Sequence, residues 1–211
     1  MEKLCIIGTG SQARYIIDIL KDSKEYTING LVDLEKRENI GNNINNYIIK
    51  CFFKDIEKTF NPHKYKVIVA YGNNKKKKEI AKELSSMNYR FTSVISNKSY
   101  ISTNVSIGKG CIINPNVTIM PNTKIGNNVI IHSGSVIEHD NIIENFVNIA
   151  PGVSTSGNVK IGEGSYIYTG TTIIPNINIG KWAIVGAGTT VVEDVIEKDI
   201  VVGNPARSIK K

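Results

Sequence analysis

A six-residue repeat fills the second half of the chain and constrains its fold more than any other feature. Counting every sixth residue from Ile95 to Val191 gives 17 positions, of which 16 hold Ile or Val and one holds Thr155. A stripe with this period cannot stay on one face of an α-helix, and simple strand alternation does not place Gly, Asn and Pro at fixed phases. The repeat therefore predicts a coil built of short strands and turns.

Three hexapeptides complete one triangular coil, in which the Ile/Val stripe points inward and stacks on the next coil. Each of five glycines follows a stripe residue, where a chain turning a corner needs either conformational freedom or the absence of a Cβ. They are Gly108, Gly126, Gly162, Gly180 and Gly186. We predict a parallel β-helix of about five to six coils over residues 95–211. The strict Ile-Gly-x-x-Val-x rhythm favours the left-handed form.

The first half, residues 1–94, alternates short apolar segments with segments of helical spacing. Such alternation is typical of an α/β domain with a parallel sheet and helices on both faces, a small Rossmann-like fold. Strands are expected at residues 4–7, 28–32, 66–70 and 91–95, helices at 14–20 and 75–87, and a polar loop at 35–46. Ligands of such sheets bind beyond the carboxyl ends of the strands.

A glycine-rich turn follows the first expected strand. Gly8-x-Gly10-x-x-Ala13, with Asp33 further along the chain, resembles a dinucleotide fingerprint in which backbone N–H groups approach a phosphate. Asp33 would then accept a hydrogen bond from a ribose or sugar hydroxyl. Because residues 1–94 are too few for two mononucleotide halves, a single nucleotide such as a nucleotide-sugar is favoured over NAD, and an oxidoreductase is disfavoured. A tight turn without a ligand stays the alternative.

Two of the three histidines, His132 and His139, lie in the repeat, and acids flank His139 on both sides. A neutral imidazole is a suitable general base near neutral pH, and an adjacent carboxylate such as Asp140 or Glu138 can orient it. Zinc chemistry on such a helix would want three imidazoles, so no metal is expected.

Composition excludes several classes of partner. The net charge of +7 comes mainly from residues 1–94, which hold 17 of the 26 Lys and Arg residues and include the run Lys75–Lys78. This run lacks the interleaved aromatics that stack bases, so no nucleic-acid partner is expected. No stretch of 18 apolar residues occurs and a signal peptide is not expected, so we predict no membrane insertion. Three dispersed cysteines without a CxxC motif favour the reducing cytoplasm.

Several segments of the chain carry a resemblance to a known family. Ile137–Asp140, Asn145–Gly152 and Gly157–Gly162 resemble the sugar acetyltransferases that include sialic acid O-acetyltransferases and N-acetyltransferases of UDP-4-amino-sugars. The N-terminal glycine turn, Gly72–Lys75 and the ending Val202–Ala206 extend the likeness over nearly the whole chain.

The resemblance implies specific roles for residues of both domains. His139 would be the general base, with Asp140 as its acidic partner. The nucleotide-sugar would be held by Gly8, Gly10, Ser11, Asp33, Gly72, Asn73 and Asn74, with His132 beside the acceptor. Acetyl-CoA would lie in a groove between two prisms of a homotrimer and meet Asn148, Gly157, Thr169 and Ala187. Arg207 and Lys210, from their charge, would approach the CoA phosphates.

The chain also departs from the pattern of this family. Asn148 stands where many relatives have a second histidine, and Tyr168 stands where glycine is frequent beside the CoA channel. With His139 retained, we expect an acetyl-CoA-dependent N-acetyltransferase of surface-glycan biosynthesis, acting without a covalent intermediate on a UDP-4-amino-4,6-dideoxy sugar. O-acetylation of a sialic-acid-like hydroxyl and a non-catalytic nucleotide-sugar-binding trimer stay open as alternatives.

Overall fold

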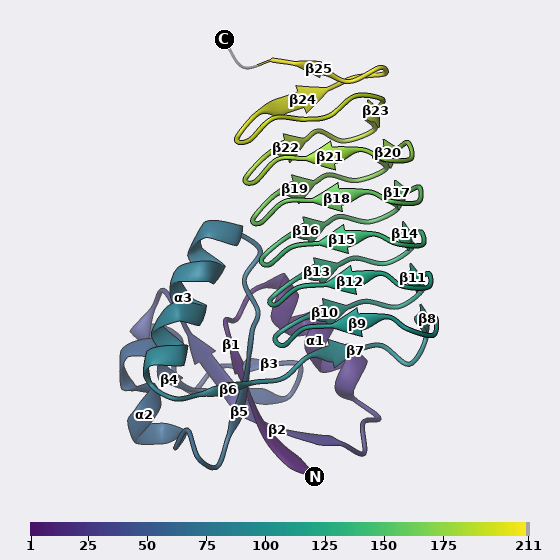
Figure 1. The fold of residues 1–211 in the computed structure, drawn as a ribbon. Helices are drawn as coiled ribbons and strands as arrows, with labels where there is room; N and C mark the ends of the chain where they lie inside the picture. The colour runs from purple at the N-terminus through teal and green to yellow at the C-terminus, as the bar shows by residue number, and fades with distance from the viewer. Residues whose placement is uncertain (210–211) are drawn as a thin grey trace. The chain divides into compact units, whose positions relative to one another are not determined.

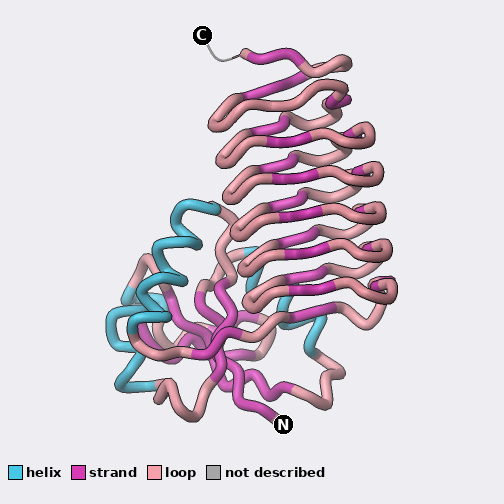
Figure 2. The backbone as a smooth tube through the Cα atoms, in the orientation of Figure 1, coloured by secondary structure: helices cyan, strands magenta, loops and turns pink. Residues whose placement is uncertain are grey.

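The computed structural model describes residues 1–209 and divides between Val94 and Ile95 into two compact units. The first unit is an α/β domain, and the second is a stack of short strands joined by turns (Figures 1 and 2).

The α/β unit contains a six-stranded sheet with the order β3-β4-β2-β1-β5-β6. Neighbouring strands are parallel except for the β3–β4 pair. The strands are β1 (Glu2–Ile7), β2 (Tyr26–Asp33), β3 (Asn43–Ile44), β4 (Tyr47–Phe52), β5 (Lys66–Val69) and β6 (Arg90–Phe91). The helices are α1 (Ser11–Leu20), α2 (Ile56–Thr59) and α3 (Asn74–Ser86), with 3-10 turns η1 (Arg37–Asn39) and η2 (Phe53–Asp55).

Local sequence explains the central elements of this unit. The last four residues of β1 are all fully buried, as expected for a strand covered on both faces of a parallel sheet. Helix α1 buries one stripe, Ala13, Ile16, Ile17 and Leu20, at the spacing of a helix face. Helix α3 begins where the side chain of Asn73 accepts a hydrogen bond from the backbone N–H of Lys76 at 3.0 Å.

The unit differs from the sequence prediction between residues 35 and 59, where the short helix α2 was also not predicted, and again at residues 91–95. The polar segment 35–46 contains η1 and β3, and it leads into β4, a strand that was not predicted. The strand expected at residues 91–95 is divided into β6 and β7 (Val94–Ile95). The break falls at Thr92, whose N–H still bonds to Val67 O of the α/β sheet, whereas β7 already belongs to the largest sheet of the second unit.

The second unit is a left-handed parallel β-helix with three sheets. Strands one coil apart pair in parallel and in register, as Ile113 does with Ile131. The eight-stranded sheet contains β7, β10 (Ile112–Ile113), β13 (Ile130–Ile131), β16 (Asn148–Ile149), β19 (Tyr166–Ile167), β22 (Ile184–Val185), β24 (Ile200–Val202) and the antiparallel β25 (Arg207–Ser208). The six-stranded sheet contains β8 (Tyr100–Ile101), β11 (Thr118–Ile119), β14 (Val136–Ile137), β17 (Ser154–Thr155), β20 (Thr172–Ile173) and β23 (Thr190–Val191). The five-stranded sheet contains β9 (Ser106–Ile107), β12 (Lys124–Ile125), β15 (Ile142–Ile143), β18 (Lys160–Ile161) and β21 (Asn178–Ile179).

The Ile/Val stripe forms the core of the prism, as predicted. From Ile113 to Val191 every stripe residue is at most 4% exposed, including Thr155. The stripe residue Ile95, in the first strand of the stack, is 40% exposed. Residues four positions after the stripe, such as Val117, Val129 and Val147, are buried in the same cluster, so both positions of the hexapeptide supply the hydrophobic energy of this unit.

The corners show which of the two predicted reasons for glycine applies. Glycines that directly follow the stripe have ordinary φ angles, but a Cβ at Gly126 would lie 2.8 Å from the backbone N of Asn145 in the next coil. Their role is close approach of the coils. From residue 104 to residue 188, the residues with a left-handed φ angle lie three positions after a stripe residue. Most of them are Asn or Gly, which adopt this conformation most readily, and the others are Asp140, Phe146 and Trp182.

Candidate functional site

His139 lies in the corner between β14 and β15 and is paired with its neighbour in sequence. Its Nδ1 is 2.8 Å from Oδ2 of Asp140, and the two side chains are 53% and 43% exposed. Asp140 adopts a left-handed φ of 58° and also accepts a hydrogen bond from Asn122 at 3.1 Å, one coil earlier. The hydrogen bond from His139, supported by that from Asn122, lowers the pKa of Asp140 below its ordinary value. The pair therefore presents an ionised carboxylate to the imidazole.

This pairing determines what His139 can do chemically. A neutral imidazole that donates from Nδ1 to a carboxylate keeps the lone pair of Nε2 available for a proton. The carboxylate also stabilises the imidazolium that forms when Nε2 takes a proton. The corner is thus suited to general-base chemistry at Nε2.

Gly157, one coil after His139, provides the surface on which the imidazole rests. A Cβ at position 157 would lie 2.4 Å from Cε1 and 2.6 Å from Nε2 of His139. Gly157 has an ordinary φ angle, so it is the space for the ring and not the backbone conformation that requires glycine here. Gly157 was expected to contact the cofactor; in the structure it lies under the His139 ring.

Two buried polar residues that sequence reasoning missed hold the backbone of this corner. Asn141, fully buried, donates to the carbonyl oxygens of Glu138 and Ser156 and accepts from the N–H of Val159 at 2.9 Å. The Thr155 hydroxyl accepts from the N–H of Glu138 at 3.3 Å. Thr155 is the one stripe position without Ile or Val. That interruption of the repeat was a signal for a special corner.

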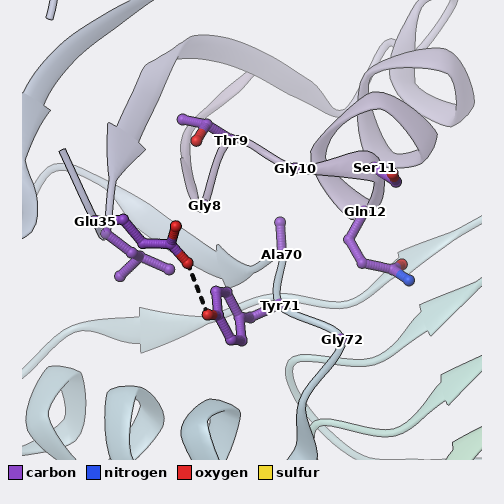
Figure 3. A pocket seen from close by; sticks show the side chains of 10 residues that line it. Gly8, Thr9, Gly10, Ser11, Gln12, Glu35, Ala70, Tyr71 and Gly72 are labelled. Atoms are coloured by element: carbon purple, nitrogen blue, oxygen red, sulfur yellow. Dashed lines mark hydrogen bonds between the residues drawn. The ribbon is translucent and has the colours of Figure 1, made fainter. Parts of the chain in front are cut away.

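A pocket of about 380 Å³ lies at the carboxyl ends of β1 and β5 in the α/β unit (Figure 3). It is lined by the turn Gly8–Gln12, by Leu34 and Glu35 after β2, and by Ala70–Gly72. Gly8 has φ of 120°, and a Cβ there would lie 2.6 Å from Ala70 O, so only glycine fits this approach. Gly10 is the N-cap of α1, whose first N–H groups are suited to an anion. The predicted residues Gly8, Gly10, Ser11 and Gly72 thus meet in one pocket.

Asp33 lies behind this pocket and supports the turns that form it. It is 1% exposed, and its Oδ1 accepts from the N–H groups of Glu35 at 2.7 Å and Lys36 at 2.8 Å. Its Oδ2 accepts from the Thr9 hydroxyl at 3.0 Å and the Asn39 amide at 2.8 Å. Burial opposes ionisation of this carboxyl, but the four hydrogen bonds outweigh it and lower the pKa of Asp33.

Glu35 and Tyr71 were not singled out from the sequence, yet both line the pocket. The Tyr71 hydroxyl donates to Oε1 of Glu35 at 2.9 Å (Figure 3). This hydrogen bond, together with partial burial, raises the pKa of Tyr71 above its ordinary value. The sequence signal was weak: an acid two residues beyond the end of a strand and a tyrosine directly before a glycine turn.

Asn73 and Asn74, also expected to contact the substrate, are part of α3. Asn73 is its N-cap, and Asn74 in its first turn is 7% exposed. Neither lines the pocket, whereas their neighbour Gly72 does.

The other predicted residues of the β-helix lie in different corners or in its interior. His132 is half-buried in the corner after β13, which is a different corner from that of His139. Asn148, in β16, is fully buried. Thr169 and Ala187 are exposed in successive coils, where the N–H of Gly188 bonds to Thr169 O at 2.9 Å. Tyr168, the departure noted above, stacks on Tyr166 with ring centroids 4.3 Å apart.

The C-terminal residues predicted to meet CoA phosphates are only partly described. Arg207, in β25, is exposed and donates to Ala206 O at 2.7 Å. It lines a cavity of about 210 Å³ together with the acids Glu193, Asp194 and Asp199. Lys210 lies outside the described residues.

Neither a metal-ligand cluster nor a membrane-spanning helix occurs within residues 1–209. No three His, Cys, Asp or Glu side chains in that part of the chain gather in the manner of a metal site. Within the same range, no helix combines the length and the apolar character needed to cross a bilayer.

Comparison with known proteins shows what the two units resemble. Residues 3–84 match the PglD N-terminal domain family, and residues 104–139 match the bacterial transferase hexapeptide repeat. A variant of the perosamine N-acetyltransferase of Caulobacter crescentus, solved with CoA and GDP-perosamine, is 24% identical; the match covers 100% of this chain and 98% of that one with a TM-score of 0.93. The acetyltransferase domain of PglB from Neisseria gonorrhoeae, solved with acetyl coenzyme A, is 25% identical with 99% of both chains covered and a TM-score of 0.90. WeeI from Acinetobacter baumannii is 25% identical, with 99% and 100% covered and a TM-score of 0.85.

Proposed function

We propose that this chain, which belongs to the hexapeptide-repeat sugar acetyltransferases with a PglD-type N-terminal domain, transfers the acetyl group of acetyl-CoA to the amino group of a nucleotide-linked 4-amino-4,6-dideoxy sugar. The observation that carries the proposal is His139, paired with an ionised Asp140 and resting on Gly157 with Nε2 available. The pocket of the α/β unit and the relatives solved with CoA and GDP-perosamine or with acetyl coenzyme A support it.

In the proposed reaction the neutral sugar amine attacks the thioester carbonyl of acetyl-CoA. Nε2 of His139 takes the proton from the nitrogen as the new N–C bond forms, and Asp140 stabilises the resulting imidazolium. A backbone N–H stabilises the oxyanion of the tetrahedral intermediate. When the C–S bond breaks, the imidazolium returns the proton to the thiolate, so that N-acetyl sugar and CoA leave with no covalent enzyme intermediate.

The pocket of the α/β unit is the proposed binding site for the nucleotide. The turn Gly8–Gly10 and the N-terminus of α1 offer backbone N–H groups for a diphosphate, because the glycines leave no Cβ in the way. We assign uridine as the base, from the resemblance to the enzymes of UDP-4-amino-sugars. Guanosine, the base of the GDP-perosamine bound by the Caulobacter crescentus relative, is the alternative that the assay below distinguishes.

A homotrimer is proposed because the expected contacts to acetyl-CoA lie on separate surfaces of one prism. Gly157 lies in the corner with His139, whereas Thr169 and Ala187 lie in the corner after the eight-stranded sheet. A groove between two parallel prisms brings a corner of one protomer beside a different surface of its neighbour, and three prisms close with cyclic symmetry. Light scattering should then give about three times the 23.2-kDa chain mass.

The cytoplasm is the proposed location of the protein. Its three buried free cysteines fit that reducing compartment.

The function is tested by following thiol release from acetyl-CoA with UDP- and GDP-linked 4-amino-4,6-dideoxy sugars and with sialic acid. We expect turnover with a nucleotide-linked amino sugar and a loss of roughly 10²- to 10⁴-fold in His139→Ala. The control is His63→Ala, because His63 belongs to the other unit and lies in a turn. Turnover with sialic acid alone would replace the proposal by O-acetylation. Binding of nucleotide-sugars without any turnover would replace it by a non-catalytic binding role.

A further inference from the structure

Two acids follow each other closely at the end of β2, and the structure separates their roles. An acid at this place in a Rossmann-like sheet accepts hydrogen bonds from ribose hydroxyls when the phosphates sit at the glycine turn. Asp33 stands at that place in the sequence but is 1% exposed and already accepts four hydrogen bonds within the protein. A ribose could reach it only by breaking that set.

Glu35, two residues further, has the access that Asp33 lacks. It is exposed and lines the pocket opposite the turn that carries Gly10. Its Oε1 accepts from the Tyr71 hydroxyl at 2.9 Å, and its other oxygen points away from Tyr71 (Figure 3). Asp33 sets this placement, because its Oδ1 holds the N–H of Glu35 itself.

We propose that Glu35 hydrogen-bonds the ribose 2′-hydroxyl of the nucleotide and thereby selects sugars carried on ribonucleotides over those carried on 2′-deoxyribonucleotides. The inference rests on the proposed function, since it takes the pocket to be the nucleotide site. A carboxylate only accepts hydrogen bonds, and the 2′-hydroxyl is the one donor that a 2′-deoxyribose lacks. A deoxyribonucleotide would cover Glu35 and leave its oxygen without a donor, which costs more than a missing favourable contact.

Tyr71 is a positioning residue in this scheme. It comes from the end of β5, whereas Glu35 follows β2, so the hydrogen bond joins the two sides of the pocket. A glutamate side chain has several rotatable bonds, and holding one oxygen directs the other toward the ligand. Removing the hydroxyl should therefore weaken selection without changing the affinity for deoxyribonucleotides.

The experiment is isothermal titration of the full chain with two matched pairs of free nucleotides, UDP with 2′-deoxy-UDP and GDP with 2′-deoxy-GDP. For whichever base binds, the wild type should favour the ribonucleotide by about 10- to 100-fold, the range of a hydrogen bond to a charged group. Glu35→Ala should reduce this preference to about twofold or less, and Tyr71→Phe should reduce it in part with 2′-deoxy binding unchanged. Glu38→Ala is the matched control, because it removes an exposed acid of the same segment that pairs with Lys36 and does not line the pocket.

The ratio within each pair separates this inference from its alternatives. A charge removed near a diphosphate changes both affinities equally, so the ratio reports only the 2′-hydroxyl. A wild type that binds both members equally, or a Glu35→Ala variant that keeps the full preference, would overturn the inference while the proposed function stands. If none of the four nucleotides binds, the pocket is not a nucleotide site, and the inference fails together with that part of the proposed function. Acetyl transfer to a nucleotide-sugar, measured separately, shows which of the two has failed.

Discussion

Substituting Gly157 by alanine tests the placement of the catalytic imidazole without touching the imidazole itself. The added Cβ would lie 2.4 Å from Cε1, 2.6 Å from Nε2 and 3.1 Å from Nδ1 of His139, whereas ordinary van der Waals contact begins at 3.4 Å. The ring must therefore move by about 1 Å or rotate away. Displacement of a catalytic group by about 1 Å can cost on the order of 10² in rate, so kcat/KM should fall about 100-fold.

The stability of the Gly157→Ala variant should change little. Gly157 has an ordinary φ angle, so alanine introduces no backbone strain, and the atoms that it meets belong to a half-exposed side chain that can rotate. Gly157 is buried beneath the ring, but the ring can turn toward solvent, so we expect the free energy of unfolding to change by about 1 kcal/mol or less. Loss of activity with an unchanged melting temperature would thus separate displacement of the ring from unfolding.

The assay is acetyl transfer with the preferred acceptor, accompanied by thermal unfolding and by imidazole NMR spectra. The spectra are simple because the chain contains three histidines. Gly186→Ala is the matched control: the same change, in the same β-helix, brings a Cβ within 2.7 Å of a side-chain atom of Val202 instead of His139. We expect a shifted His139 signal in Gly157→Ala alone. Activity within about threefold of wild type, with that shift present, would refute the argument that this position of the ring is needed for catalysis.

Three further substitutions test the geometry elsewhere. Asparagine already occupies the position of Asp140 in the two neighbouring coils, at Asn122 and Asn158, with the same left-handed φ angle, so Asp140→Asn should leave the melting temperature unchanged. The imidazole of His139 loses its charged partner in this variant, so kcat/KM should fall about tenfold or more. Asp33→Asn should lower the free energy of unfolding by about 2 kcal/mol at pH 7 in urea titrations. Because folding lowers the pKa of Asp33, that contribution is complete above about pH 4 and is lost as the pH falls through the folded value, so the difference from wild type should shrink there. Ile161→Ala, at a fully buried stripe position, should cost about 2–5 kcal/mol in the same titration, and a cost below 1 kcal/mol would contradict the stacked core.

The sequence by itself determined the β-helix and the corner that carries the chemistry. Each hexapeptide buries one branched side chain at a fixed phase, so the repeat alone specifies the coil, the register of its strands and the burial of positions such as Ile131 and Ile149. His139 and Asp140 are adjacent in sequence, and their pairing in a corner needs only local geometry. The turn Gly8–Gly10 was predictable for a similar reason, since a glycine turn between a strand and a helix is a local signal.

Only the tertiary structure decided which groups stand beside these local features. Gly157 meets the His139 ring because coils stack, and the Thr155 hydroxyl reaches the backbone of Glu138 across the same gap. Asp33 and Glu35 are two acids of similar chemistry at one strand end, and no local pattern ranks them. A hydrogen bond from Thr9, distant in sequence, joins local ones from Glu35, Lys36 and Asn39 to occupy the first, whereas Tyr71, which follows β5, holds the second at the pocket. Contacts between distant segments assign those roles, because a polar group that is already saturated in the folded protein is no longer available to a ligand.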